Sequence, residues 1–305
     1  MQLFLMTFGY AGVQVAFSVQ TGNMGRIFQT LGTDPTKLGF FFILPPLAGM
    51  ITQPLIGLFS DKTWLPKLGR RIPYLIGGCA VSIVVLLLLP NTGSFGFGYG
   101  SMTALWFGAV TVLFMDLSAN VSMQPFKMII PDMVSEQQTD KAWTLQNMWG
   151  SLGGVIAFIF PFALTIFGIS NTAARGVVPD SVKISFYVAA AILLLSTIFT
   201  VINVKEYDPE TLAYYHGITA NNEKRDSFVD ILKHAPKVFW TLGIVEFFVW
   251  FGIPYMWTYS TGALSENIWH VSDPASAGYQ AAGNWFGILQ LSLIHISEPT
   301  RRSYI

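Results

Sequence analysis

Seven long apolar runs, separated by polar connections, constrain the fold of this chain more than any other feature. They cover residues 3–24, 38–60, 72–90, 102–126, 143–168, 184–204 and 238–264, and an eighth begins near Ala275. Each complete run can cross a bilayer as a helix, because about 20 residues at a rise of roughly 1.5 Å span the hydrocarbon core. The sequence therefore predicts an all-α polytopic membrane protein.

The composition excludes several other classes of protein. Hydrophobic residues make up 52% of the 305 residues and charged residues only 11%, whereas soluble domains average roughly 25% charged residues. The formal net charge of +0 gives no sign of a nucleic-acid partner. The single cysteine, Cys79, lies inside an apolar run, so there is no disulfide framework and no CxxC metal site. We expect no metal and no cofactor.

The placement of lysine and arginine predicts the orientation in the membrane. With a cytoplasmic N-terminus, the cytoplasmic connections hold eleven of these residues and the outer connections hold four. Lysine and arginine are retained on the cytoplasmic side during insertion. We therefore expect an integral protein of the plasma membrane, or of the inner membrane in a bacterium, with its N-terminus in the cytoplasm.

Polar residues divide the apolar runs into two groups. Residues 1–203 contain six runs and predict an N-terminal six-helix transmembrane bundle. Residues 204–236 are rich in Lys, Glu, Asp and Asn and predict a cytoplasmic central loop, with a short surface helix at Phe228–His234. Residues 237–290 then hold the seventh helix and part of an eighth.

The final segment, residues 291–305, does not continue the eighth apolar run. It reads LSLIHISEPTRRSYI and places Glu298 and Arg301 where an apolar helix should continue. The preceding residues 275–290 would form only about 24 Å of helix, which is short for a membrane span. LSLIHISEPTR resembles the conceptual translation of a transposon-end adapter used to prepare sequencing libraries. We expect the native sequence to end at Gln290, with a natural cytoplasmic tail as the alternative.

A short basic loop separates the second and third runs. It contains the pattern Gly57-x-x-x-Asp61 followed by Gly69-Arg70-Arg71. This pattern resembles the loop between helices 2 and 3 of the major facilitator superfamily. The resemblance implies two six-helix bundles around a central site. This chain would then hold the complete N-terminal bundle and the truncated start of the C-terminal bundle.

The same resemblance implies that Asp61, Gly69, Arg70 and Arg71 are gating residues. Asp61 ends the second run, and the C-terminal end of a helix is unfavourable for an acid unless another group compensates its charge. In the family this acid is thought to bond across to the second bundle and hold one side closed. The alternative is a loop whose charges only set the orientation, which would explain the arginines but neither Asp61 nor Gly69.

Three longer segments narrow the resemblance. Residues 9–32, 49–73 and 116–132 are similar to the first, second and fourth helices, with their adjoining loops, of plant sucrose transporters and their animal and bacterial relatives. This glycoside–cation symporter group implies secondary active uptake of a sugar, a disaccharide or an α-glucoside, coupled to protons. The expected partners are the sugar, the proton and the lipid bilayer, and the expected state is a monomer.

Polar residues form one stripe along the fourth run. Asp116, Asn120, Gln124 and Lys127 follow at intervals of 4, 4 and 3 residues, which places them on one face of a helix. A carboxylate inside a membrane is costly and should face a partner or a water-filled cavity, as in proton relays. We therefore predict that Asp116 loads and releases the coupling proton. The alternative is an acid that only bonds neighbouring helices.

Lys127 stands where the resembling family carries arginine. A lysine keeps the charge but loses the planar fork that binds carboxylates or hydroxyls bidentately. Lys127 is therefore either a cavity residue, together with Asn120 and Gln124, or an anchor near the cytoplasmic end of the helix.

Polar residues in the first and seventh runs are further candidates for the substrate cavity. Gln14 and Gln20 suit sugar hydroxyls because an amide both donates and accepts hydrogen bonds. The alternative for both is hydrogen bonding between helices, which is common in membranes. Glu246 lies inside the seventh run and Trp250 follows one turn later, so both are candidates for the cavity. Glu246 could instead be a structural partner.

Three other functions compete with proton-coupled sugar uptake. Sodium-coupled glycoside symporters of the melibiose type carry paired acids in the second helix, whereas residues 38–60 contain no acid and only Gln53 as an amide. A non-transporting sugar sensor would need a sizeable output domain, and the central loop is too small for one. A membrane enzyme should show His or acid pairs at metal spacing, such as HExxH, and the sequence shows none.

Overall fold

Helices account for most of the described chain. The computed structural model describes residues 2–34, 39, 44–215 and 233–297. Within these ranges no β-strand occurs, which confirms the predicted all-α fold class. The elements are α1 (Gln2–Phe8), α2 (Tyr10–Thr30), α4 (Leu44–Lys62), α5 (Ile72–Leu88), the 3-10 turn η2 (Leu89–Ser94), α6 (Met102–Met133), α7 (Glu136–Ile166), α8 (Asp180–Asn203), α9 (Pro209–Tyr215), α11 (Lys237–Ile268) and α12 (Ala277–Ser297).

Five of the predicted spans form helices that are long and apolar enough to cross a bilayer, and they make this an integral membrane protein. The helices α4, α11 and α12 occupy the positions of the predicted second, seventh and eighth runs. The five spans are Gln2–Thr30, Ile72–Ser94, Met102–Met133, Glu136–Ile166 and Asp180–Asn203.

Two helices extend further than the apolar runs predicted. α6 reaches Met133 instead of ending near residue 126, and α7 begins at Glu136 instead of near residue 143. With 32 residues, α6 is about 48 Å long, so its ends project beyond a hydrocarbon core of roughly 30 Å. Helical hydrogen bonds persist in the headgroup region, where polar side chains are tolerated. Lys127 therefore lies inside α6 and not in a connection.

Two sequence predictions concern segments at the edge of the described structure. α12 continues past Gln290 to Ser297, so helical backbone extends into residues 291–297. The adapter origin of that segment stays a prediction. The expected surface helix at Phe228–His234 lies outside the described residues except for its last two positions.

Local signals set several helix ends. α6 begins after Ser101, whose hydroxyl accepts a hydrogen bond from the Ala104 N–H at 3.1 Å and so acts as the N-cap. α7 ends at Ile166 and is followed by Gly168, whose φ of 85° is the left-handed conformation that terminates many helices.

α2 lies at the centre of the bundle and packs against α6, α7 and α8. Its buried apolar residues include Val19, Ile27 and Phe28. α5 approaches α6 closely at Gly78, where a Cβ atom would lie 2.5 Å from the Ser122 Oγ. Small residues at such contacts favour helix association in membranes, because they let the helix backbones approach.

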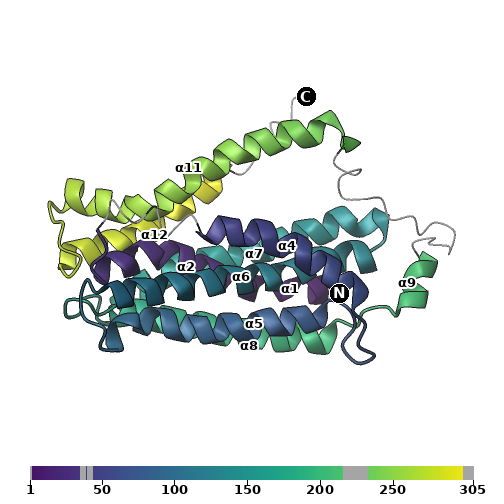
Figure 1. Ribbon diagram of the computed structural model, residues 1–305, viewed down its shortest axis with the longest axis horizontal. Coiled ribbons are helices and arrows are strands. Elements are labelled where there is room, and N and C mark those ends of the chain that lie inside the picture. Colours follow the sequence, from purple (N-terminus) through teal and green to yellow (C-terminus); the bar gives the residue numbers. More distant parts are fainter. Residues whose placement is uncertain (1, 35–38, 40–43, 216–232, 298–305) are drawn as a thin grey trace.

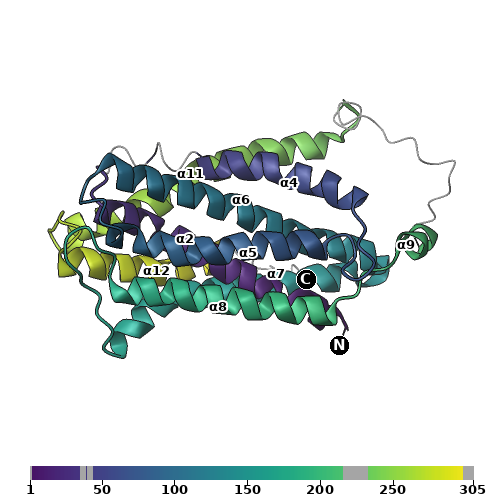
Figure 2. The ribbon, with the colours of Figure 1, turned by 60° about the horizontal axis from the view of Figure 1, so that its bottom comes forward.

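The connections alternate between two ends of the bundle (Figures 1 and 2). The end that holds the N-terminus and the α4–α5 loop is called the Arg71 end, and the opposite end is called the Arg26 end. α12 packs along α2 and α7, and α11 contacts α2 and α12. The first half of α11, residues 237–249, is exposed and diverges from the bundle toward the Arg71 end (Figure 1).

Candidate functional site

The acid predicted to carry the proton is buried within the six-helix bundle. Asp116 on α6 is only 4% exposed, and Gln20 on α2 is fully buried. The Nε2 of Gln20 donates a hydrogen bond to the Asp116 Oδ2 at 2.9 Å. Within the described residues no cation pairs with Asp116, so its side-chain partner there is a neutral amide.

Two more polar residues extend this contact to α4. The Asn120 Nδ2 donates to the backbone carbonyl of Asp116 at 2.8 Å, and the Asn120 Oδ1 accepts from the Gln53 Nε2 at 2.6 Å. Gly49, one turn before Gln53, lets α4 approach, because a Cβ atom there would lie 3.1 Å from the Asn120 Nδ2. Gln20, Gln53, Asp116 and Asn120 form one connected group, called the Asp116 cluster.

The other predicted cavity residues lie outside the Asp116 cluster. Gln124 and Lys127 are half-buried further along α6, and the Gln124 Oε1 has no hydrogen-bond partner among the described residues. Gln14 faces a cavity beside α7. Glu246 is exposed on the diverging half of α11. Trp250 belongs to the same helix, but its side chain lies outside the described part of the structure.

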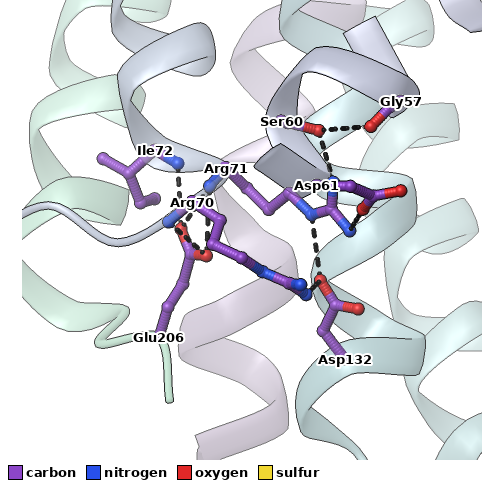
Figure 3. A network of polar contacts seen from close by, with 8 residues as sticks. All are labelled: Gly57, Ser60, Asp61, Arg70, Arg71, Ile72, Asp132 and Glu206. Carbon is purple, nitrogen blue, oxygen red and sulfur yellow. Dashed lines mark hydrogen bonds and ion pairs between the residues drawn. The ribbon is translucent and has the colours of Figure 1, made fainter. Parts of the chain in front are cut away.

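The predicted gating residues meet at the Arg71 end (Figure 3). Arg71 is only 2% exposed, and its Nη2 pairs with the Asp61 Oδ1 at 2.6 Å. Its Nε contacts the Asp132 Oδ2 at 2.9 Å, and its Nη1 donates to the Ser60 Oγ. Arg70 pairs with the same Asp132 oxygen at 2.8 Å. Arg71 thus joins the end of α4 to the end of α6 and compensates the charge of Asp61.

Glu206 completes this network from the segment after α8 (Figure 3). Its carboxylate accepts hydrogen bonds from the backbone N–H groups of Arg70, Arg71 and Ile72, each at 2.9 Å. These groups open α5, so the acid is placed at the positive end of that helix. Gly69 has a φ of 86°, and a Cβ atom there would lie 2.7 Å from the Glu206 Cδ. Any other residue at this position would be strained and would displace the Glu206 side chain.

A second buried arginine closes the opposite end. Arg26 on α2 is 2% exposed. Its Nη1 donates to the Asn284 Oδ1 at 3.0 Å, its Nη2 to the Asn171 Oδ1 at 2.8 Å, and its Nε to the Gln280 Oε1. Two of these partners belong to α12, so Arg26 ties the first bundle to that helix through neutral amides.

An exposed ion pair joins the loops at the same end. The Arg175 Nη2 lies 2.9 Å from the Asp273 Oδ2, and both side chains face solvent. The backbone N–H of Ala275 and the Arg175 guanidinium hold the pKa of Asp273 below its usual value. The pair therefore carries both charges at neutral pH.

A comparison with known protein families shows which family the chain matches. The family model described as Major Facilitator Superfamily matches residues 6–297. The chain belongs to the Major Facilitator Superfamily. The match confirms the predicted fold, in which a six-helix bundle is followed by the start of a second one.

Plant sucrose transport proteins are similar to this facilitator chain. One from Oryza sativa subsp. indica is 25% identical over 226 residues, which are 67% of this chain and 43% of the rice protein. One from Arabidopsis thaliana is 22% identical over 297 residues, which are 92% of this chain and 58% of that protein. The chain thus spans about half the length of the curated relatives it matches.

Sequence reasoning missed several residues that the structure places in these networks. Asp132 entered only as the last residue of the segment 116–132 that resembles a fourth helix, and Gln53 only as the lone amide of the second run. Arg26 was counted as a loop charge. Glu206 carried a usable signal, because an acid directly after an apolar run can serve a neighbouring helix N-terminus. The partners of Asp132 and Arg26 lie 61 to 258 residues away, beyond any local pattern.

Proposed function

We propose that this chain is the N-terminal part of a proton-coupled sugar symporter in which Asp116 carries the proton. The observation that supports this most directly is a buried carboxyl group whose side-chain partner is the neutral Gln20 amide. Intramembrane acids of this kind mark proton pathways. The similarity to sucrose transport proteins supports a sugar as the substrate.

The geometry suggests how the proton could move a helix. An ionised Asp116 accepts from the Gln20 Nε2, whereas a protonated carboxyl group can also donate. The buried Gln20 Oε1 has no hydrogen-bond partner among the described residues and can accept from such a group. A change of protonation would therefore turn the Gln20 amide and shift the contact between α2 and α6.

The proposal includes the membrane setting. The transporter is a monomer in the plasma membrane, or in the inner membrane of a bacterium, with the N-terminus and the Arg71 end in the cytoplasm. The excess of lysine and arginine on that side supports this orientation. Arg71 and its ion-pair partners Asp61 and Asp132 then act at the cytoplasmic gate, and none of the three contacts the sugar.

The coupling role is tested in a full-length transporter that carries this sequence, reconstituted in vesicles with an imposed pH gradient. We expect Asp116→Asn to abolish accumulation of labelled sucrose while exchange of labelled for unlabelled sugar partly survives. Thr111→Val is the matched control on α6, because among the described residues this hydroxyl bonds to the Phe107 carbonyl of its own helix and to no other helix. An unchanged pH dependence of uptake in Asp116→Asn would show that another group couples transport to protons.

The same vesicles separate protons from sodium as the coupling ion. Sodium-coupled symporters of the melibiose type carry paired acids in the second helix, whereas residues 38–60 contain no acid. We expect a sodium gradient without a pH gradient to drive no accumulation. Sodium-driven uptake would favour the melibiose type of mechanism, and the absence of any uptake would favour a sensor.

A further inference from the structure

A polar cavity lies between α2 and α7, apart from the Asp116 cluster. Its volume is about 330 Å³, at the lower end of the range for small-molecule sites, roughly 300–1,000 Å³. Two glycines of α7 shape its wall: a Cβ atom at Gly150 would lie 3.0 Å from the Tyr10 ring, and one at Gly154 would lie 3.4 Å from the Ser18 Oγ. The lining residues are Tyr10, Gln14, Ser18, Asn147, Gly150, Ser151, Gly154 and Phe158.

Phe158 closes this cavity toward the Arg26 end. A Cβ atom at Gly22 of α2 would lie 2.8 Å from the Phe158 ring. One at Gly287 of α12 would lie 2.5 Å from the Phe158 carbonyl oxygen. The three helices therefore meet around Phe158, and the cavity lies on the face of the bundle that α12 covers.

Two pairs of polar side chains face each other across the cavity. Gln14 and Ser18 are one turn apart on α2, and Asn147 and Ser151 are one turn apart on α7. None of the four forms a side-chain hydrogen bond with another described residue. Their amides and hydroxyls both donate and accept hydrogen bonds. The lining includes no charged residue.

This chemistry favours a neutral ligand that carries several hydroxyl groups. Four two-way hydrogen-bonding groups match hydroxyls, and the Tyr10 and Phe158 rings offer apolar surface to the carbon faces of a sugar ring. An anion or a cation would find no counter-charge here. Ser18 is buried, Gln14 is half-buried, and Asn147 and Ser151 line the open side of the cavity. A ligand without a hydroxyl for the buried Ser18 would leave that group unpaired, which favours hydroxylated ligands.

We propose that the α2–α7 cavity is a binding subsite for one sugar unit of the substrate, with Gln14, Ser18, Asn147 and Ser151 as its hydrogen-bonding residues. This inference rests on the proposed function and assigns its sugar contacts. Ser18 and Gln20 are two residues apart and therefore lie on nearly opposite faces of α2. One face of α2 contacts the sugar and the other contacts Asp116, so a movement of α2 links the two.

The subsite is tested in the full-length transporter that carries this sequence, with sucrose as the probe. We expect Asn147→Ala and Gln14→Ala each to raise the KM for sucrose roughly two- to tenfold, the value of one neutral hydrogen bond. The maximal rate and the pH dependence should stay unchanged. Thr144→Ala is the matched control, because Thr144 is an exposed residue one turn before the cavity on α7.

Chemical labelling gives a second readout that does not depend on turnover. In a Cys79→Ser background, Asn147→Cys should react with a water-soluble maleimide and be protected by sucrose but not by potassium chloride of equal osmolarity. Thr144→Cys should react equally with and without sucrose. Size-exclusion chromatography confirms that each variant is folded.

The outcomes separate this inference from the proposed function. A raised KM together with protection at position 147 supports the subsite. Normal sucrose uptake with an unchanged KM and no protection overturns the subsite and leaves the symporter intact. A parent transporter that neither transports nor binds sucrose or any other disaccharide or α-glucoside overturns both.

Discussion

Two buried charged residues of the bundle, Asp116 and Arg71, differ in the partners that surround them. Among the described residues Asp116 has one side-chain partner, the neutral Gln20 amide, and under the proposed function it changes its protonation state. Arg71 instead bonds to Asp61, Asp132 and Ser60 and is placed to hold two helix ends together. A buried charge with several hydrogen-bond partners is costly to separate from them. The two residues thus suit the different tasks proposed for them, coupling for Asp116 and gating for Arg71.

Gly69 gives a sharp prediction at this scale. A side chain there must adopt the left-handed conformation, at a cost of about 1–2 kcal/mol, and its Cβ would overlap Glu206. We expect Gly69→Ala to lower the free energy of unfolding by about 1–3 kcal/mol, measured by denaturation in mixed micelles.

Gly77→Ala is the control for that measurement. Gly77 lies in the middle of α5, and a Cβ atom there would meet no atom within 4 Å. Alanine should be neutral or stabilising by up to about 1 kcal/mol at such a helical position. Equal stabilities of the two variants would show that the α4–α5 loop does not require a glycine.

At the scale of elements, the long apolar runs predicted where helices form but not where all of them end. The runs at residues 102–126 and 143–168 became α6 and α7, which extend to Met133 and back to Glu136. Hydropathy measures the part of a helix that lies in lipid, whereas backbone hydrogen bonding sets its full length. The sequence could not show this difference.

The candidate site was predictable only where its residues share a helix. The spacing of Asp116 and Asn120 placed them on one face, and the structure joins them through a hydrogen bond at 2.8 Å. The contacts to Gln20 and Gln53 depend on the packing of α2 and α4 against α6, which no local pattern encodes. Gln14 was linked to the same cavity as Gln20, but the two residues face different helices.

The contact between α2 and α12 yields a prediction for these elements. Removing the Arg26 side chain leaves the Asn284 and Gln280 oxygens in a buried place without their donor, at a cost of about 1–3 kcal/mol each. We expect Arg26→Ala to speed amide hydrogen exchange in α12 at least roughly tenfold, with α5 unchanged.

Arg175→Ala tests whether that effect is specific. Arg175 joins the same end of the molecule to Asp273, but both groups are exposed, and such pairs contribute little. Its removal should leave exchange in α12 unchanged. Faster exchange in both variants would assign the closure to overall charge at this end instead of to the buried Arg26 contacts.

At the scale of the whole molecule, the two ends of the bundle differ. α12 and the end of α11 are tied to the first bundle at the Arg26 end, whereas the first half of α11 stands apart at the Arg71 end (Figure 1). In the proposed orientation this arrangement is closed to the outside and open to the cytoplasm. Alternating access then requires the Arg26 contacts to break and the Arg71 end to close.

The last prediction concerns the 305-residue chain by itself. Residues 1–203 form a bundle with its own core, whereas the first half of α11 exposes Phe239, Phe247 and the acid Glu246. An acid in the hydrocarbon region costs at least about 2.5 kcal/mol when it has no partner. We expect the chain to insert with a stable six-helix bundle and a loosely held α11. Hydrogen exchange should therefore be much faster at residues 237–249 than in α2.

Reconstituted vesicles should accumulate no sucrose, because rocking between two bundles needs both of them. Accumulation at the rate of the full-length transporter would show that eight helices suffice for transport.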